Sequence, residues 1–182
     1  MRKKKISYAK IGVIAAIAGI AAFLCFFKLG VADIREWDEA TNALVVYESL
    51  ESSTPWDLHL EGEPFFEKGP LWYYATMAVV KLNGYSAVSL RLVSALSGFL
   101  LILSVLFIGW NMFGFTAGAI SSLILLTTRH LFFFDPAGIC STHHIRSADG
   151  DLLQILLMTW AGWAAWRVTR GQNRWLLNLM RS

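Results

Sequence analysis

Four long apolar runs alternate with polar segments along this chain. They cover about residues 11–27, 87–110, 115–134 and 152–168. A helix needs roughly 20 mostly apolar residues to cross the hydrocarbon core of a bilayer, which is about 30 Å thick. The pattern therefore predicts an all-α polytopic membrane protein with about four transmembrane helices, forming a single domain over residues 1–182.

The first apolar run has an alternative interpretation as a cleaved signal peptide. Basic residues precede it at positions 2–5, and Gly30, Val31 and Ala32 offer a cleavage site near Ala32. The apolar core of a signal peptide usually has 7–15 residues, and this run is longer. The length favours a retained transmembrane helix.

The polar segment between the first two runs, residues 28–86, contains two predicted helices. The first covers 38–51, because Ala40, Ala43, Leu44, Tyr47 and Leu50 recur on one helical face. A proline suits the first position of a helix, so the second is predicted from Pro70 to about Leu82. We expect both helices to lie in the membrane interface.

The basic residues at the two ends of the chain predict its orientation. Lys and Arg at positions 2–5, 10, 167, 170, 174 and 181 flank the first and last runs. Positive residues favour the cytoplasmic side. We therefore expect an integral protein of the plasma or inner membrane with both termini cytoplasmic. The 28–86 and 135–151 loops then lie outside, with all 13 Asp and Glu residues.

Composition narrows the class of protein. The chain is 55% hydrophobic and only 16% charged, which is more apolar and less charged than a typical soluble domain. Its basic residues gather at the ends of the chain and form no stripe for nucleic acid. Nucleotide-binding loops and the nucleophile elbow of serine hydrolases have no match in the sequence.

Asp38 and Glu39 are the first candidates for chemistry, since they open the first predicted interfacial helix. A carboxylate at the membrane surface suits a general base, which accepts a proton from a substrate hydroxyl. The alternative is a helix N-cap, in which Asp38 accepts from free backbone N–H groups.

Lys68 lies two residues before the second predicted helix. A cation there is unfavourable against the helix dipole unless an anion binds as well. A phosphate could then take the ammonium and the free N–H groups together. The alternative is a solvated lysine among acidic neighbours.

The segment before the last run carries Arg146, Asp149 and Asp151. The two carboxylates suit a cation or sugar hydroxyls, and Asp149 could instead cap the following helix. Arg91, at the start of the second run, could extend to the interface or pair with a carboxylate or phosphate. Adjacent His143 and His144 have no metal-ligand spacing around them, so no cofactor is expected, and a divalent cation has no support in the sequence.

Four motifs occur in order along the predicted outer face. They are Asp38-Glu39-Ala40, residues 62–73 (GEPFFEKGPLWY), 91–95 (RLVSA) and 146–153 (RSADGDLL). Together they resemble the N-terminal part of the GT-C class membrane glycosyltransferases that use polyprenyl-phosphate sugars, such as protein O-mannosyltransferases and lipid A aminoarabinose transferases. Gly69 stands where those proteins have the first of two prolines.

The resemblance implies a reaction and a role for each residue. A sugar would pass from a polyprenyl-phosphate donor to a lipid, glycan or protein acceptor on the outer face, with inversion. Asp38 would be the catalytic carboxylate, supported by Glu39. Lys68 would hold the lipid phosphate with help from Arg91. Asp149 and Asp151 would line the same cavity, and Arg146 would be a further substrate-binding residue.

The family typically continues through many more spans than four. We therefore expect this chain to be the N-terminal part of such an enzyme. The alternative is a non-catalytic relative or subunit that needs a partner chain to supply further spans.

Overall fold

The computed structural model describes residues 7–35, 37–132 and 144–170, and these are mainly helical. The elements in chain order are α1 (Tyr8–Phe26), α2 (Asp38–Glu51), β1 (His59–Leu60), β2 (Glu63–Pro64), α3 (Pro70–Asn83), α4 (Ala87–Phe113), α5 (Phe115–Thr127), α6 (Arg129–Phe132) and α7 (Asp151–Thr169). The two short strands form an antiparallel hairpin. The expected helices over 38–51, about 70–82 and about 152–168 are confirmed as α2, α3 and α7.

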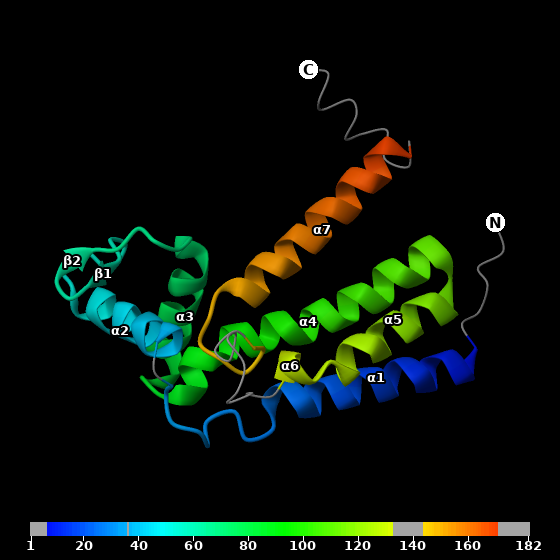
Figure 1. Cartoon of the computed structure of the whole chain (residues 1–182), viewed down its shortest axis with the longest axis horizontal. Helices are drawn as coiled ribbons and strands as arrows, with labels where there is room; N and C mark the ends of the chain where they lie inside the picture. The colour runs from blue at the N-terminus through cyan, green and yellow to red at the C-terminus, as the bar shows by residue number, and fades with distance from the viewer. Residues whose placement is uncertain (1–6, 36, 133–143, 171–182) are drawn as a thin grey trace.

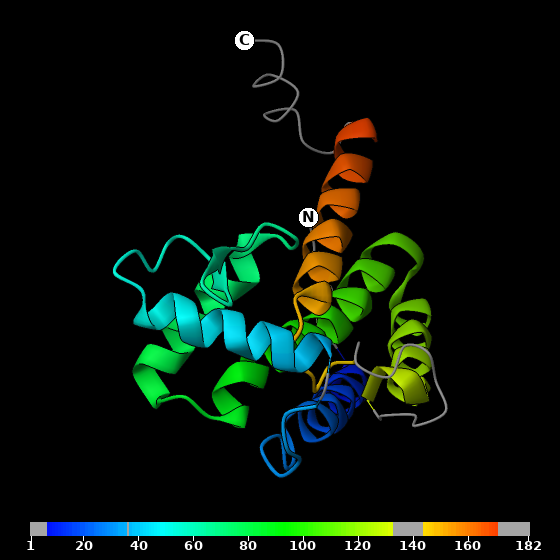
Figure 2. The same ribbon diagram turned by 60° about the vertical axis from the view of Figure 1, so that its left-hand side comes forward.

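The helices form two neighbouring groups (Figure 1). In the first, α1, α4 and α5 run side by side and contact one another, and α7 packs on α4. In the second, α2, α3 and the hairpin gather near the start of α4 (Figure 2). Each group has its own buried apolar cluster, so α4 links two cores.

The turn between α4 and α5 depends on glycine. Gly114 has φ +99°, a conformation that side chains rarely adopt. On either side of the turn, Gly109 of α4 and Gly118 of α5 lie in close contact. A Cβ on Gly109 would lie 2.7 Å from the Gly118 Cα. The absence of side chains at these two positions allows the backbones to approach closely.

Two helices within the described residues are long and apolar enough to cross a membrane. They are α1, with 19 residues, and α4, with 27 residues, and an 18-residue window within them has a mean hydropathy of 2.2 and 2.5, respectively. These helices support association with a membrane. The expected number of four spans is not confirmed.

The third predicted span, residues 115–134, is interrupted. Its helix α5 ends at Thr127 after 13 residues, a length of about 20 Å at 1.5 Å per residue. The Thr127 and Thr128 hydroxyls both donate to the Ile124 carbonyl, at 3.0 and 2.9 Å. A separate turn, α6, begins at Arg129. The rest of the predicted span and residues 135–143 of the second outer loop lie outside the described residues.

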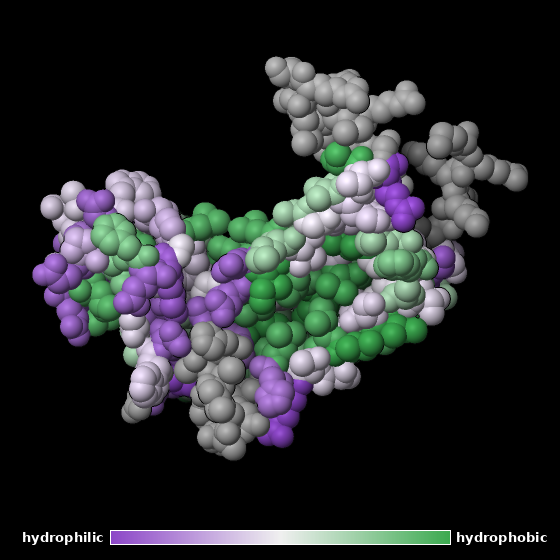
Figure 3. All heavy atoms as spheres, turned by 45° about the horizontal axis from the view of Figure 1, so that its top comes forward, coloured by the Kyte–Doolittle hydropathy of each residue, from purple (hydrophilic) through white to green (hydrophobic). Residues whose placement is uncertain are grey.

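The surface is divided along the molecule (Figure 3). On the face shown, hydrophobic residues gather over the helical bundle, and hydrophilic residues gather over the end formed by α2, α3 and the hairpin. This division suits a bundle in lipid with a polar end beside it.

Candidate functional site

A buried ion pair joins α2 to α4. The Arg91 Nε donates to Glu39 Oε1 at 2.7 Å, and its Nη2 donates to Glu39 Oε2 at 2.9 Å. Both residues are almost fully buried, with exposed fractions of 2% for Arg91 and 1% for Glu39. The paired, parallel bonds fix the direction of both side chains.

The remaining hydrogen bonds of Glu39 reach two other segments. The Arg35 and Ala148 backbone N–H groups each donate to its carboxylate at 2.9 Å. Burial acts to raise the pKa of Glu39, but the bonds from Arg91, Arg35 and Ala148 outweigh it and hold the pKa below its ordinary value. Glu39 is thus a charged, fully bonded anchor for segments that are distant in sequence.

The guanidinium of Arg91 also holds the segment that follows α1. Nη1 donates to the carbonyls of Leu29 and Ala32, at 3.0 and 2.7 Å, and Nη2 donates to the Asp33 carbonyl at 2.8 Å. Of the partners left open by the sequence, the structure selects a carboxylate and backbone carbonyls. These contacts support a positioning role for Glu39 and Arg91.

Asp38 and Asp149 share the ammonium of Lys68. The Lys68 Nζ lies 2.9 Å from Asp38 Oδ1 and 3.8 Å from Asp149 Oδ1. About a third of each of the Lys68 and Asp38 side chains is exposed, whereas Asp149 is 1% exposed. Two carboxylates and one ammonium therefore meet where α2, the 67–69 segment and the start of α7 converge.

Asp38 is the first residue of α2, and Trp37 occupies the N-cap position without a capping side-chain bond. The expected alternative of Asp38 as an N-cap is therefore not the arrangement present. Trp37 has φ +68°, a strained conformation for a bulky residue. Such strain often marks functional sites, and here it directly precedes Asp38.

The backbone around Asp149 is clamped to three helices. Ser94 of α4 exchanges hydrogen bonds with the Asp149 backbone and accepts one from Trp72 Nε1 at 3.0 Å. Asn42 of α2 donates to the Ala148 carbonyl at 2.8 Å. The Asp149 carboxylate itself accepts from the Gly150 N–H at 2.6 Å.

Tyr73 of α3 completes this clamp. Its hydroxyl donates to Asn42 Oδ1 at 2.6 Å, and its side chain is buried. Burial and the negative charges of Asp149, Asp38 and Glu67 raise the pKa of Tyr73, so its hydroxyl stays protonated and continues to donate.

A cavity of about 540 Å³ opens beside Lys68 and Asp149, between the N-terminal ends of α3 and α7. Its polar part includes Lys68, Asp149 and Asp151, and its apolar part includes Leu157 and Met158 of α7. The first N–H groups of α3 have no partner within the helix. At the polar end, Lys68 and these N–H groups are available to an anion, although Glu67, Asp149 and Asp151 line the same cavity, and the other end suits hydrocarbon.

Arg146 lies elsewhere. Its Nη2 donates to the Phe27 and Lys28 carbonyls at the end of α1, at 2.8 and 3.1 Å. It lines a second cavity, together with Lys28 and Arg35. The structure thus brings together Asp38, Lys68, Asp149 and Asp151, places Glu39 and Arg91 in the supporting framework, and places Arg146 in a different cavity.

Sequence reasoning missed the residues that position this site. Asn42 lies four residues after Asp38, and Ser94 three residues after Arg91, so each shares a helical face with a candidate. That spacing is a signal that could have identified them. Nothing in the sequence pairs Tyr73 with Asn42, because the contact depends on how α2 packs against α3.

The described residues hold no group of three or more His, Cys, Asp or Glu side chains arranged to bind a metal ion. Comparison with protein-family models, with curated proteins and with solved structures finds no match to this chain. The functional argument therefore depends on the geometry of the chain itself.

Proposed function

We propose that this chain is a membrane glycosyltransferase of the GT-C class, or the N-terminal part of one. It would transfer a sugar from a polyprenyl-phosphate donor to a lipid, glycan or protein acceptor. One observation carries the proposal: Lys68 lies between Asp38 and Asp149, at 2.9 and 3.8 Å, beside a cavity with polar and apolar ends.

The phosphate of the donor fits the polar end of this cavity. Lys68 supplies an ammonium, and the N-terminal N–H groups of α3 supply donors and a favourable dipole. A phosphate here competes with Asp38 for Lys68. Binding of the donor would therefore release the Asp38 carboxylate from its closest described cation.

Asp38 then acts as the general base. The acceptor oxygen bonds to the anomeric carbon while the bond from that carbon to the lipid-phosphate oxygen breaks, and the configuration inverts. The electron pair leaves with the phosphate, and the acceptor's hydroxyl proton passes to Asp38. A phosphate is a good leaving group, so the step needs no strong general acid.

Asp149 and Asp151 border the cavity on the side of α7. Buried Asp149 has its backbone fixed by Ser94, so its carboxylate has little freedom to move. Such a carboxylate suits a hydroxyl of the transferred sugar, because a charge-assisted hydrogen bond is directional. Asp151 lies at the start of α7, where its negative charge interacts favourably with the helix dipole. It borders the same cavity.

The lipid chain of the donor fits the apolar end. Leu153, Leu157 and Met158 of α7 line this part of the cavity, and Leu157 and Met158 remain about half exposed. The two buried residues of α7 lie in its first two turns, and its far end stands away from α4 (Figure 1). An isoprenoid chain could cover the side chains left open there.

The same exposed side of α7 favours the second candidate function, a subunit completed by a partner chain. A partner helix would cover these side chains as well as a lipid would. In either case the distribution of Lys and Arg supports cytoplasmic termini, with the Lys68 cavity on the outer side.

A transfer assay tests the proposal. Wild-type protein in liposomes receives polyprenyl-phosphate mannose or polyprenyl-phosphate aminoarabinose, and labelled sugar on the co-reconstituted membrane acceptors is measured. Asp38→Asn should lower transfer at least 100-fold, whereas Glu51→Gln, at the exposed end of α2, should leave it unchanged. Transfer by Asp38→Asn at the wild-type rate would refute the mechanism. An inactive wild-type chain that co-purifies with another membrane protein would favour the subunit.

A further inference from the structure

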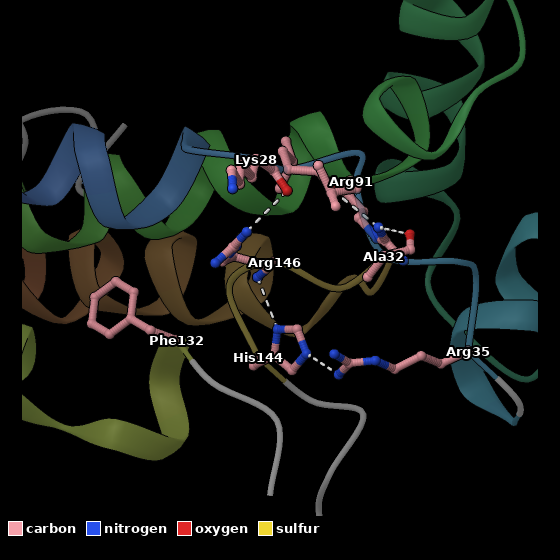
Figure 4. Close-up of a pocket in the computed structure, with 9 residues that line it drawn as sticks. Lys28, Ala32, Arg35, Arg91, Phe132, His144 and Arg146 are labelled. Carbon is pink, nitrogen blue, oxygen red and sulfur yellow. Dashed lines mark hydrogen bonds between the residues drawn. The ribbon is translucent and has the colours of Figure 1, made fainter.

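A second cavity lies beside the end of α1, and Arg91 of the Glu39–Arg91 pair lines it. Its volume is about 320 Å³. It is lined by Lys28, Leu29, Val31, Ala32, Arg35, Arg91, Phe132, His144 and Arg146 (Figure 4). None of these residues lines the Lys68 cavity, so the two spaces are separate.

The charge of this lining is one-sided. Among the nine described residues that line it, four are cationic and none is a carboxylate. Glu39 pairs with Arg91 and its charge also acts on Arg35, and Lys28 and Arg146 bring two further positive charges to the same small space. Burial lowers the pKa of both Arg35 and Arg146, and the positive charge of Arg91 lowers each further, whereas the negative charge of Glu39 acts to raise the pKa of Arg35. Arginine stays protonated despite such shifts, so the cavity retains a concentrated positive charge.

His144 contacts both arginines of the same space. Its Nδ1 accepts from the Arg146 backbone N–H at 3.1 Å, and its Nε2 lies 2.7 Å from Arg35 Nη1, within hydrogen-bond distance (Figure 4). These contacts hold the Arg35 side chain beside the segment that carries Arg146.

The Arg146 side chain is also held in one orientation. Its Nη2 is fixed by the carbonyls of Phe27 and Lys28 at the end of α1. A guanidinium has five N–H donors in one plane, so a group anchored through Nη2 keeps others for an additional acceptor. Phosphate oxygens match this planar array well.

We propose that this cavity binds a phosphate group, presented either by the headgroup of an anionic lipid or by a soluble phosphate. Lys28, Arg35 and Arg146 supply the positive charge and the N–H donors. A volume of about 320 Å³ admits a phosphate and its immediate substituents. The proposal does not depend on glycosyl transfer.

The cavity also lies where a membrane headgroup is expected. It adjoins the end of α1, one of the two helices with the length and hydropathy of a span. Phe27 and Val31 beside it are exposed by 50% and 74%. Exposed apolar residues beside lysine and arginine are typical of a membrane interface, where long basic side chains reach the headgroups.

The test uses the full chain in phosphatidylcholine nanodiscs. In one arm, phosphatidic acid is added to the nanodiscs, and the lipid retained by the protein is measured by native mass spectrometry. In the other, inorganic phosphate is titrated and binding is followed by calorimetry. Each arm compares wild type with Arg146→Gln, Lys28→Gln and the control Lys81→Gln, which removes an exposed lysine at the end of α3.

We expect saturable binding to wild type in at least one arm, about tenfold weaker for Arg146→Gln and for Lys28→Gln and unchanged for Lys81→Gln. Retention of phosphatidic acid alone identifies a headgroup site, and binding of inorganic phosphate identifies a site for the free anion. Lys28→Gln guards against misfolding, because no described hydrogen bond uses the Lys28 side chain. Absence of saturable binding in both arms, or equal binding by all variants, would overturn the proposal.

Discussion

Glu39 and Arg91 form a buried ion pair, with 2.7 Å between Oε1 and Nε, and they hold four segments together. Glu39 belongs to α2 and Arg91 to α4, and their remaining hydrogen bonds fix residues 29–35 and Ala148. Arg91 lines the arginine-rich cavity, and Glu39 directly follows Asp38, the closest described carboxylate to Lys68. The pair therefore sets the relative positions of both candidate sites.

Replacement of Arg91 should destabilise the fold strongly. Arg91→Met leaves the Glu39 carboxylate buried without its cation and removes the donors to three carbonyls. Breaking one partner of a buried pair typically costs about 3–5 kcal/mol. We expect a loss of that size in denaturant unfolding, against less than about 0.5 kcal/mol for the exposed Arg129→Met. Equal stability of the two variants would contradict the anchoring role of Arg91.

The stability should fall in mildly acidic solution because of His144. Burial, with the charge of Arg35, lowers the pKa of His144 from 6.5 to about 4. The unfolded chain takes up this proton below about pH 6.5 and the folded chain only near pH 4. The contribution of neutral His144 to the free energy of unfolding is therefore fully present above pH 6.5. It is lost as the pH drops toward 4, by up to about 3 kcal/mol.

The melting temperature measured between pH 7 and pH 4 tests this expectation. His144→Asn removes the titrating group and keeps a side-chain acceptor near the position of Nδ1, so its melting temperature should fall less over this range. His130→Asn, a change at an exposed position, should titrate like wild type. A wild-type fall no steeper than that of His144→Asn would show that His144 does not control the acid response.

The close contact between α4 and α5 should be destabilised by the addition of a single methyl group at Gly109. A Cβ on Gly109 would lie 2.7 Å from the Gly118 Cα, and backbone cannot move aside cheaply. Gly109→Ala should therefore lower stability by about 1–3 kcal/mol despite the higher helix propensity of alanine. A Cβ on Gly12 of α1 meets nothing within 4 Å, so Gly12→Ala should be neutral or stabilising. The melting temperatures of the two variants, measured in parallel, test this expectation. Equal melting temperatures would contradict the close contact at Gly109.

The two neighbouring tyrosines of α3 should respond differently to loss of their hydroxyls. Tyr73 donates to buried Asn42, whereas Tyr74 donates to the Trp56 carbonyl at an exposed position. Tyr73→Phe leaves a buried acceptor unsatisfied, which typically costs about 1–3 kcal/mol, and Tyr74→Phe should cost less than 1 kcal/mol. The free energy of unfolding of both variants would be measured in the same detergent. A larger loss for Tyr74→Phe would contradict the role of Tyr73 in the clamp.

Local pattern predicted the helices well. Apolar spacing and Pro70 placed α2 and α3 almost to the residue, because both signals act within a single turn. The third predicted span was less accurate, since α5 ends at Thr127 and a separate turn follows from Arg129. Hydropathy averages over a window of residues and does not show a helix end within an apolar run.

The candidate site was predicted in part. Asp38 and Lys68 were each chosen for their place beside a helix start, and their contact across 30 residues agrees with a shared site. Arg146 was grouped with Asp149 because the two are close in sequence. The turn at residues 147–149 directs Arg146 toward the end of α1 and Asp149 toward Lys68. Sequence proximity does not give the direction of side chains across a turn.

The most direct test of the central claim is the affinity of the protein for a polyprenyl phosphate. Binding to the full chain in nanodiscs would be measured for wild type, Lys68→Gln and the exposed control Lys81→Gln. The account predicts saturable binding that Lys68→Gln weakens about tenfold or more and that Lys81→Gln leaves unchanged. Wild-type affinity in Lys68→Gln, or no binding to wild type, would contradict a lipid-phosphate site between Asp38 and Asp149.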